Sequence, residues 1–204
     1  MPQGVAAPSR GDIMNRLDEI YDKIERDPKF QKYRDTKARL VRGHGSTEPK
    51  VIFVGEAPGR LENARRTPFV GPAGQELKKL MAHAKIDPDD VYYTNVLKYW
   101  PHVDYSTRTP TDEEIRDAAP YLMEELDYLA DDNTIVGLCG RTALGAIFPD
   151  MTSITHVHGT RLFIDGISIV PVYHPAVLLY KSQPFEKVLA DYKLIGELAY
   201  AGIA

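Results

Sequence analysis

The stretch VIFVGEAPGRLENARRTPFVGPAGQELKKLM, residues 51–81, decides the fold of this chain. Its first four residues, 51–54, form a short apolar run that breaks at Gly55 into a turn containing proline and a second glycine. Another glycine-rich turn, residues 71–74, opens a segment whose apolar residues recur at helical spacing. The order of strand, glycine-rich loop and helix predicts an open α/β sheet, in which ligands bind at the carboxyl ends of the strands.

Strands and helices alternate along the rest of the chain. This alternation predicts a single α/β domain, residues 12–204, with a mainly parallel central sheet flanked by helices on both faces. Residues 1–11 are predicted to form a disordered tail, and residues 28–50 to be irregular. Further strands are expected at 91–96, 134–138 and in a hairpin at 161–170, and helices at 12–25, 111–129, 140–148 and from about 184.

Composition favours one globular domain: 204 residues, 43% hydrophobic and 26% charged. No apolar run is long enough to span a bilayer and the N-terminus lacks an apolar signal core, so we expect a cytoplasmic protein with no membrane partner. The single cysteine, Cys139, excludes an internal disulfide and a cysteine-rich metal site. No metal site is expected from the scattered histidines, and nothing requires more than a monomer.

The net charge of −4 argues against binding nucleic acid through overall charge. An enzyme that acts on one extruded nucleotide can manage with a local basic rim. The candidates for such a rim are Arg60, Arg65 and Arg66 beside the first glycine turn, with Lys37, Arg39 and Arg42 before the first strand. A solvated surface is the alternative explanation for each of the two clusters.

Four motifs occur in a fixed order: GEAPG at 55–59, PFVGPAGQEL at 68–77, TNVLK at 94–98 and HPAVLL at 174–179. Together they resemble the uracil-DNA glycosylase superfamily, most closely its family 4 enzymes, over about residues 28–198. The resemblance implies an enzyme of base excision repair that cleaves the N-glycosidic bond of deoxyuridine in DNA. Such an enzyme must first extrude the base from the stack into a recognition pocket.

The resemblance implies a role for each of three residues. Asn95 would bind the base, since a primary amide offers an acceptor and a donor that match the N3–H and O4 edge of uracil. Phe69 would stack on the base. His174 would donate a hydrogen bond to O2 of the departing uracil, and a neutral imidazole suits this task.

Four more residues belong to the expected base and sugar site. Gly55 and Ala57 lie in the first motif, and Pro175 fixes an extended backbone at the residue before it. Glu56 is a catalytic candidate that would support the cationic sugar or hold the attacking water. An equally good alternative is that Glu56 bonds loop amides and is structural.

The loop after His174 is a candidate for filling the gap that an extruded base leaves in DNA. Leu178, Leu179 or Tyr180 would supply an apolar or aromatic wedge. The family usually ends this motif with arginine, so phosphate contact would fall here to Lys181.

The chain departs from family 4 in lacking the four cysteines that hold a 4Fe–4S cluster there. Residues 30–33 read FQKY, and Tyr99 and Ala118 stand at the two later cysteine positions. Cluster ligation needs thiolates, so we expect no cluster and no other cofactor. The vacated volume is expected to be filled by packing, with Phe30, Tyr33, Tyr99, Trp100 and Ala118 as the candidates.

Two alternatives to a uracil glycosylase stay open. One is a binding module that holds uracil-containing or single-stranded DNA, or a protein partner, without catalysis. The other is an enzyme for a different modified base. The acidic charge, the lost cluster and the altered loop 98–110, which contains Trp100, His102 and Tyr105, favour the binding module. Tyr99 and Trp100 would reshape the pocket for a different base. The intact Asn95 and His174 favour the glycosylase.

Overall fold

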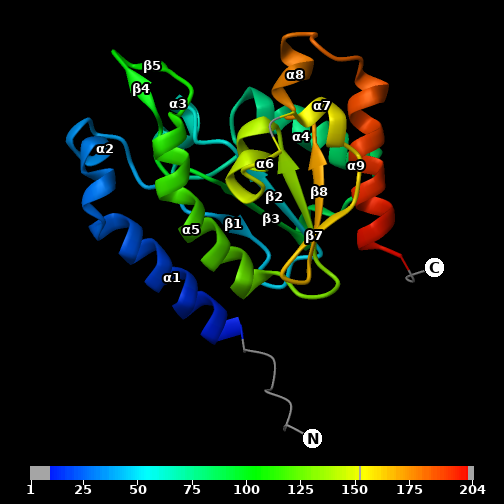
Figure 1. Cartoon of the computed structure of the whole chain (residues 1–204), viewed down its shortest axis with the longest axis horizontal. Coiled ribbons are helices and arrows are strands. Elements are labelled where there is room, and N and C mark those ends of the chain that lie inside the picture. The colour runs from blue at the N-terminus through cyan, green and yellow to red at the C-terminus, as the bar shows by residue number, and fades with distance from the viewer. Residues whose placement is uncertain (1–9, 152, 202–204) are drawn as a thin grey trace, which may run out of the picture.

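The structure, a computed structural model, describes residues 10–151 and 153–201. A six-stranded sheet forms the centre of the domain, in the order β1-β3-β2-β6-β8-β7 (Figure 1). Its four inner strands are parallel, and the two edge strands are antiparallel to their neighbours, so the predicted mainly parallel sheet is confirmed. The strands are β1 His44–Gly45, β2 Val51–Gly55, β3 Val91–Asn95, β6 Ile135–Cys139, β7 Leu162–Ile164 and β8 Ile167–Val172.

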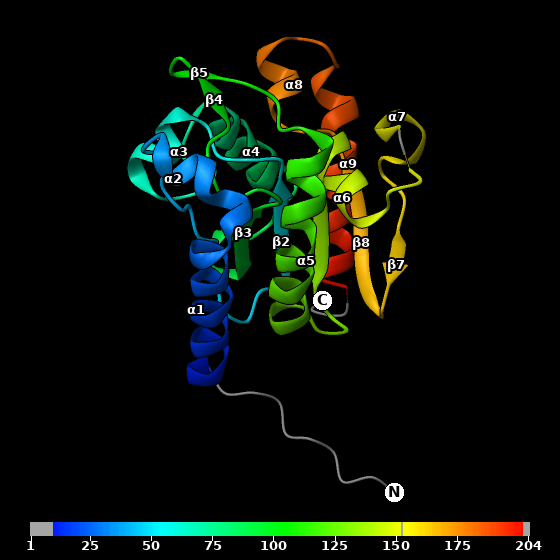
Figure 2. The same ribbon diagram turned by 60° about the vertical axis from the view of Figure 1, so that its left-hand side comes forward.

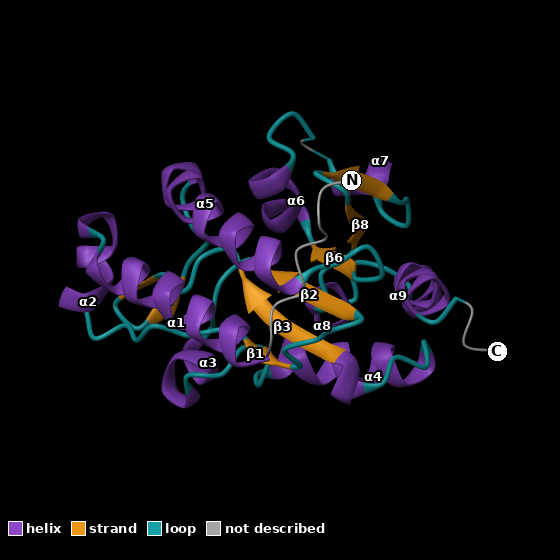
Figure 3. Cartoon of the chain, turned by 90° about the horizontal axis from the view of Figure 1, so that it is seen from below, coloured by secondary structure: helices purple, strands orange, loops and turns teal. Residues whose placement is uncertain are grey.

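Helices cover both faces of the sheet, as predicted (Figure 3). Because side chains alternate along a strand, β2 sends Ile52 and Val54 to one face and Val51 and Phe53 to the other. All four are fully buried, and removal of apolar surface from water is the main force that holds the layers together. The first face packs on α1 Arg10–Arg26, α5 Asp112–Leu129 and α6 Arg141–Ile147, and the second on α4 Pro72–His83 and α9 Phe185–Ala199.

Shorter elements complete the described chain. Residues 1–9 of the predicted tail lie outside the described residues, and α1 begins at Arg10, two residues before the expected start. The remaining elements are η1 Pro28–Phe30, α2 Gln31–Asp35, α3 Arg60–Arg65, η2 Pro88–Asp90, β4 His102–Val103, β5 Ser106–Thr107, α7 Ile154–Val157 and α8 Ala176–Leu179.

The expected helix at 111–129 and the expected hairpin at 161–170 have the local geometry that their sequences favour. The Thr111 side chain caps α5 by accepting from the Glu114 amide at 3.2 Å. In turn the Glu114 carboxylate accepts from the Thr111 amide at 2.8 Å. The hairpin between β7 and β8 turns at Asp165 and Gly166, whose φ values of 48° and 87° are those of a type I′ turn.

Residues 28–50 are more regular than predicted. The Asp27 side chain accepts from the Lys29 amide at 2.9 Å and starts η1, and the buried rings of Phe30 and Tyr33 hold η1 and α2 against the core. The loop predicted at 98–110 also contains structure, because β4 and β5 pair as a small hairpin.

Aromatic rings occupy the region where the resemblance implies an iron–sulfur cluster. Tyr33 and Tyr99 stack with their ring centroids 5.4 Å apart and an interplanar angle of 1°, and Phe30 lies 5.8 Å from Tyr99. Ala118 is buried in the same apolar cluster. Trp100 is not part of this cluster, because it stacks on His102 instead, at 4.2 Å.

These residues do not fit an iron–sulfur cluster. None of the rings provides a thiolate, and Cys139 is buried on β6 with its sulfur against the Gly137 carbonyl and the Tyr192 hydroxyl. Across the part of the chain that the structure describes, no group of three or more potential metal ligands comes together.

Candidate active site

A cavity of about 390 Å³ opens at the carboxyl ends of β2, β3 and β8. Its walls include Ala57, Phe69, Asn95 and His174, one from each of the four sequence motifs. The parallel sheet brings them together because neighbouring strands end side by side, with Gly55 of β2 in register with Asn95 of β3.

Asn95 ends β3 with its side chain facing the cavity. It is only 5% exposed, yet within the described chain its amide makes no hydrogen bond to another residue. A Cβ atom on Gly55 would lie 2.3 Å from Asn95 Oδ1 and 2.9 Å from the Phe69 ring, so only glycine fits there. The amide therefore has both its acceptor and its donors available to a ligand.

Phe69 is held in an unusual backbone conformation at the edge of the cavity. Its φ of 53° is in the left-handed region, which a bulky residue adopts only when its surroundings impose it. Gly74 makes this possible, because a Cβ atom there would lie 1.8 Å from the Phe69 carbonyl oxygen. The Phe69 ring packs on Tyr93 at 6.0 Å and lies 6.5 Å from the His174 ring across the cavity.

The protonation state of His174 follows from one hydrogen bond. The Ala176 amide donates to His174 Nδ1 at 3.2 Å, so Nδ1 is unprotonated and the ring proton is on Nε2. Burial lowers the pKa of His174 to about 4, because desolvation disfavours the imidazolium. At neutral pH the site therefore contains a neutral imidazole with Nε2–H as a donor.

The backbone beside His174 is fixed by α9. Asp191 accepts from the Tyr173 amide at 3.2 Å, and Tyr192 donates to the Tyr173 carbonyl at 2.9 Å. His158 in turn lies 2.8 Å from Asp191 and packs on the Tyr173 ring. The sequence assigned no role to His158, because this contact depends on α9 folding back onto β8.

The two glutamates of the first motif region have different surroundings. Glu56 accepts from the Thr142 hydroxyl at 2.5 Å and lines a neighbouring cavity with Arg116 and Arg141. Glu62, which the sequence analysis did not select, lines the cavity of Asn95 and accepts from the Gly71 amide at 2.8 Å. Its carboxylate thereby joins the two glycine turns, and the available signal was an acidic residue three positions after Gly59.

The structure brings some of the predicted DNA-contact residues to the cavity mouth. Arg60 and Tyr180 line the mouth, whereas Arg65 and Lys181 are exposed but not among its walls. Leu178 packs on the apolar core, and its neighbour Leu179 faces the cavity instead. Pro175, at the start of α8, and Gly55, at the end of β2, are both buried, and neither is a wall residue of the cavity.

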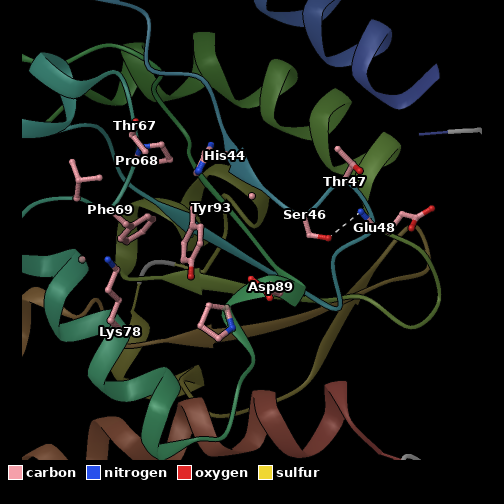
Figure 4. A pocket seen from close by; sticks show the side chains of 14 residues that line it. His44, Ser46, Thr47, Glu48, Thr67, Pro68, Phe69, Lys78, Asp89 and Tyr93 are labelled. Carbon is pink, nitrogen blue, oxygen red and sulfur yellow. Dashed lines mark hydrogen bonds between the residues drawn. The ribbon is translucent and has the colours of Figure 1, made fainter. Parts of the chain in front are cut away.

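A larger cavity, of about 710 Å³, lies on the β1 side of Phe69 (Figure 4). In Figure 4 the Phe69 and Tyr93 rings lie next to each other, with Lys78 of α4 beneath Phe69 and His44 above Tyr93. Neither Asn95 nor His174 lines it. The smaller cavity has the chemistry of a site, since it combines a free amide, an aromatic face and an imidazole donor.

This combination defines a class of protein: an α/β domain whose sheet carries, at its carboxyl end, a cavity with an aromatic face, a free amide and an imidazole donor. Residues 42–193 match the family model described as the uracil DNA glycosylase superfamily. The chain belongs to this superfamily.

Several relatives carry the name Type-4 uracil-DNA glycosylase. The protein of that name from Archaeoglobus fulgidus is 37% identical over 193 residues, which cover 91% of this chain and 94% of the relative. One from Thermotoga maritima is 37% identical over 70% of this chain and 73% of its own length. One from Saccharolobus solfataricus is 31% identical over 90% of this chain and 87% of its own length.

Proposed function

We propose that this chain is a monofunctional DNA glycosylase that hydrolyses the bond between uracil and deoxyribose in DNA and so begins base excision repair. The observation that carries the proposal is one pocket that combines the unpaired amide of Asn95, the ring of Phe69 and the Nε2–H of neutral His174. The family match and the names of the relatives support the same activity.

Base recognition is the first task. An extruded uracil would stack on Phe69, with Asn95 Oδ1 accepting from N3–H and Nδ2 donating to O4. Cytosine presents the opposite pattern at these positions, so one orientation of the amide favours uracil. Gly55 leaves the amide room to face the base, and Ala57 forms part of the wall.

Bond cleavage is the second task. As the glycosidic bond breaks, negative charge develops on uracil, and His174 Nε2–H would donate to O2. A neutral donor stabilises this charge without first taking up a proton. The sugar becomes cationic, and the carboxylate of Glu56 or Glu62 would stabilise it while water attacks the anomeric carbon.

The DNA strand itself would contact the rim. Arg60, Arg65 and Lys181 would meet phosphates, since within the described residues none of their charged groups has a hydrogen-bond or ion-pair partner. Tyr180, 80% exposed, would fill the gap that the extruded base leaves.

The proposal extends to where and how the enzyme works. Among the described residues, no helix has the length and apolar character needed to cross a membrane. A cytoplasmic location and a monomeric state are the further parts of the proposal.

A single-stranded oligonucleotide with one deoxyuridine, treated with alkali after incubation, tests the activity. Asn95→Ala and His174→Ala should each slow cleavage by about 10²–10³-fold, because each removes hydrogen bonds to the transition state. Asn133→Ala and His156→Ala, on exposed positions, are matched controls and should cleave at the wild-type rate.

Near-wild-type rates in both active-site variants would overturn the assignment. A strand that binds the wild-type protein but stays uncut would indicate the binding module. Cleavage at other bases in a substituted panel, with uracil spared, would indicate a different modified base.

A further inference from the structure

The β4–β5 hairpin displays an aromatic side chain at its tip. Tyr105 is 70% exposed, and both tip residues are left-handed, with φ 48° at Asp104 and 60° at Tyr105. Glycine or asparagine is normally found in such a turn, because a bulky side chain is strained there. A tyrosine kept at this position indicates a use for its exposed ring.

A stack of rings leads from the core to this tip. Trp100 is buried and lies 4.2 Å from His102 at an interplanar angle of 14°, and His102 lies 6.2 Å from Tyr105. Trp100 Nε1 donates to the Thr107 hydroxyl at 2.9 Å, which ties the segment before β4 to β5.

The base of the hairpin is anchored to α5. The Arg108 guanidinium makes two bonds to the Glu114 carboxylate, at 2.7 and 2.8 Å, and the Arg108 amide donates to the Pro101 carbonyl at 3.0 Å. A bidentate pair of this kind fixes orientation as well as position. The hairpin is therefore a preorganised platform rather than a loose loop.

The hairpin is continuous with the uracil pocket. Thr107 of β5 lines that pocket, together with Leu179 of α8 and Tyr180, the residue after it. The hairpin and α8 project from the same end of the molecule, toward which β6 and β8 point (Figures 1 and 2). Among the large apolar side chains that are exposed in the described chain, five of seven are on the hairpin, on α3, or on α8 and the residue after it: Leu61, Val103, Tyr105, Leu179 and Tyr180.

The hairpin, α3 and α8 therefore present a largely apolar and aromatic surface beside the pocket, on a chain whose net charge is −4. Duplex DNA offers a protein mainly phosphates and groove edges, so its binding depends on neutralised phosphates. Single strands also offer the faces of their bases, and aromatic side chains stack on them without regard to sequence.

We propose that the β4–β5 hairpin is a base-stacking platform on which Tyr105 stacks a base near the extruded uridine, so that single-stranded uracil-containing DNA is the preferred substrate. This inference rests on the proposed glycosylase function and deepens it by naming the substrate class. His102 supports the Tyr105 ring from below.

The test compares kcat and KM of wild type, Tyr105→Ala and Tyr105→Phe on one deoxyuridine oligonucleotide, single-stranded and annealed to its complement. Wild type should favour the single strand. Tyr105→Ala should raise KM for the single strand at least about fivefold with kcat retained, since one base–aromatic stack is lost. Tyr105→Phe keeps the ring and should behave as wild type, and on the duplex Tyr105→Ala should change little.

Phe163→Ala is the matched control. Phe163 is also an exposed aromatic residue on a hairpin, 60% exposed, but it lies on β7 at the far edge of the sheet (Figure 2). The loss of the Phe163 ring should change neither kcat nor KM, on the single strand or on the duplex. An unchanged KM in Tyr105→Ala, or an equal loss on both substrates, would overturn the proposal.

A binding experiment separates this inference from the proposed function. Trp100 is the single tryptophan of the chain, so its fluorescence reports directly on the hairpin. A single-stranded oligonucleotide with thymine in place of uracil should alter this fluorescence in wild type, and with lower affinity in Tyr105→Ala. If wild type excises no uracil but this dependence holds, the glycosylase assignment fails and the platform stands. If wild type excises uracil but its affinity for the single strand does not depend on Tyr105, the glycosylase assignment stands and the platform fails.

Discussion

Burial lowers the pKa of His174 to about 4, below the ordinary value of 6.5 for an imidazole. Between pH 6.5 and 4 the unfolded chain therefore takes up a proton that the folded chain does not. Stability from this group is present above pH 6.5 and is lost as pH falls toward 4, by about 2–3 kcal/mol in the free energy of unfolding. Denaturant titrations at several pH values should show this slope in wild type and its absence in His174→Gln. Parallel curves for the two proteins would contradict the assignment of a neutral, half-buried imidazole.

Sequence predicts single residues well where a motif carries them. Asn95, Phe69 and His174 were expected from three separate strings, and they line one cavity. Glu62 and Thr107 were not expected, because their places in that cavity depend on how two loops fold over it. Of the two leucine candidates on α8, Leu179 lines the cavity and Leu178 packs on the core, because the direction of a side chain on so short a helix is set by its packing.

At the scale of elements, β3 is joined to α5 by a buried ion pair. Lys98 Nζ lies 2.5 Å from Glu125 Oε2 and donates to the Asn95 carbonyl at 2.6 Å, so the pair also holds the end of β3 that carries the Asn95 amide. Glu125 further accepts from the Tyr92 hydroxyl at 2.9 Å. Burial lowers the pKa of Lys98, which means that the ammonium depends on its partner to stay charged.

Glu125→Gln should therefore lower the free energy of unfolding by about 3–5 kcal/mol, because it leaves a buried charge without its counter-ion. Glu124→Gln, one residue away on the same helix, breaks the exposed pair with Lys23 and should cost no more than about 1 kcal/mol. Chemical denaturation of the two variants makes the comparison. Equal losses in the free energy of unfolding would show that the buried Lys98–Glu125 pair stabilises the fold no more than the exposed Lys23–Glu124 pair does.

The two hairpins illustrate why some elements can be predicted and others cannot. Asp165-Gly166 is a strong local signal for a type I′ turn, and that hairpin was expected. Asp104-Tyr105 carries no such signal, because its left-handed turn is stabilised by ring stacking and by the Arg108–Glu114 pair rather than by glycine. The edge strand β1 was missed for a related reason, since it is two residues long and is defined only by pairing with β3.

At the scale of the whole molecule, the aromatic stack attaches the N-terminal helices to the sheet. Tyr33 and Phe30 come from the segment after α1, and Tyr99 follows β3. Their contact therefore joins two segments that are far apart in the sequence. All three rings are buried. The stack lies where the resemblance implies a metal cluster, and it makes the same connection by packing that thiolates would make by ligation.

Tyr99→Ala should consequently lower the free energy of unfolding by about 3–5 kcal/mol, as expected for the loss of a large buried ring. Phe163→Ala removes an exposed ring and should change it by less than about 0.5 kcal/mol. If packing alone stabilises this region, prolonged treatment of the wild-type protein with an iron chelator should leave its thermal unfolding and its uracil excision unchanged. Iron that copurifies in stoichiometric amount, with a lower unfolding temperature after chelation, would mean that a metal and not the aromatic stack joins the N-terminal helices to the sheet.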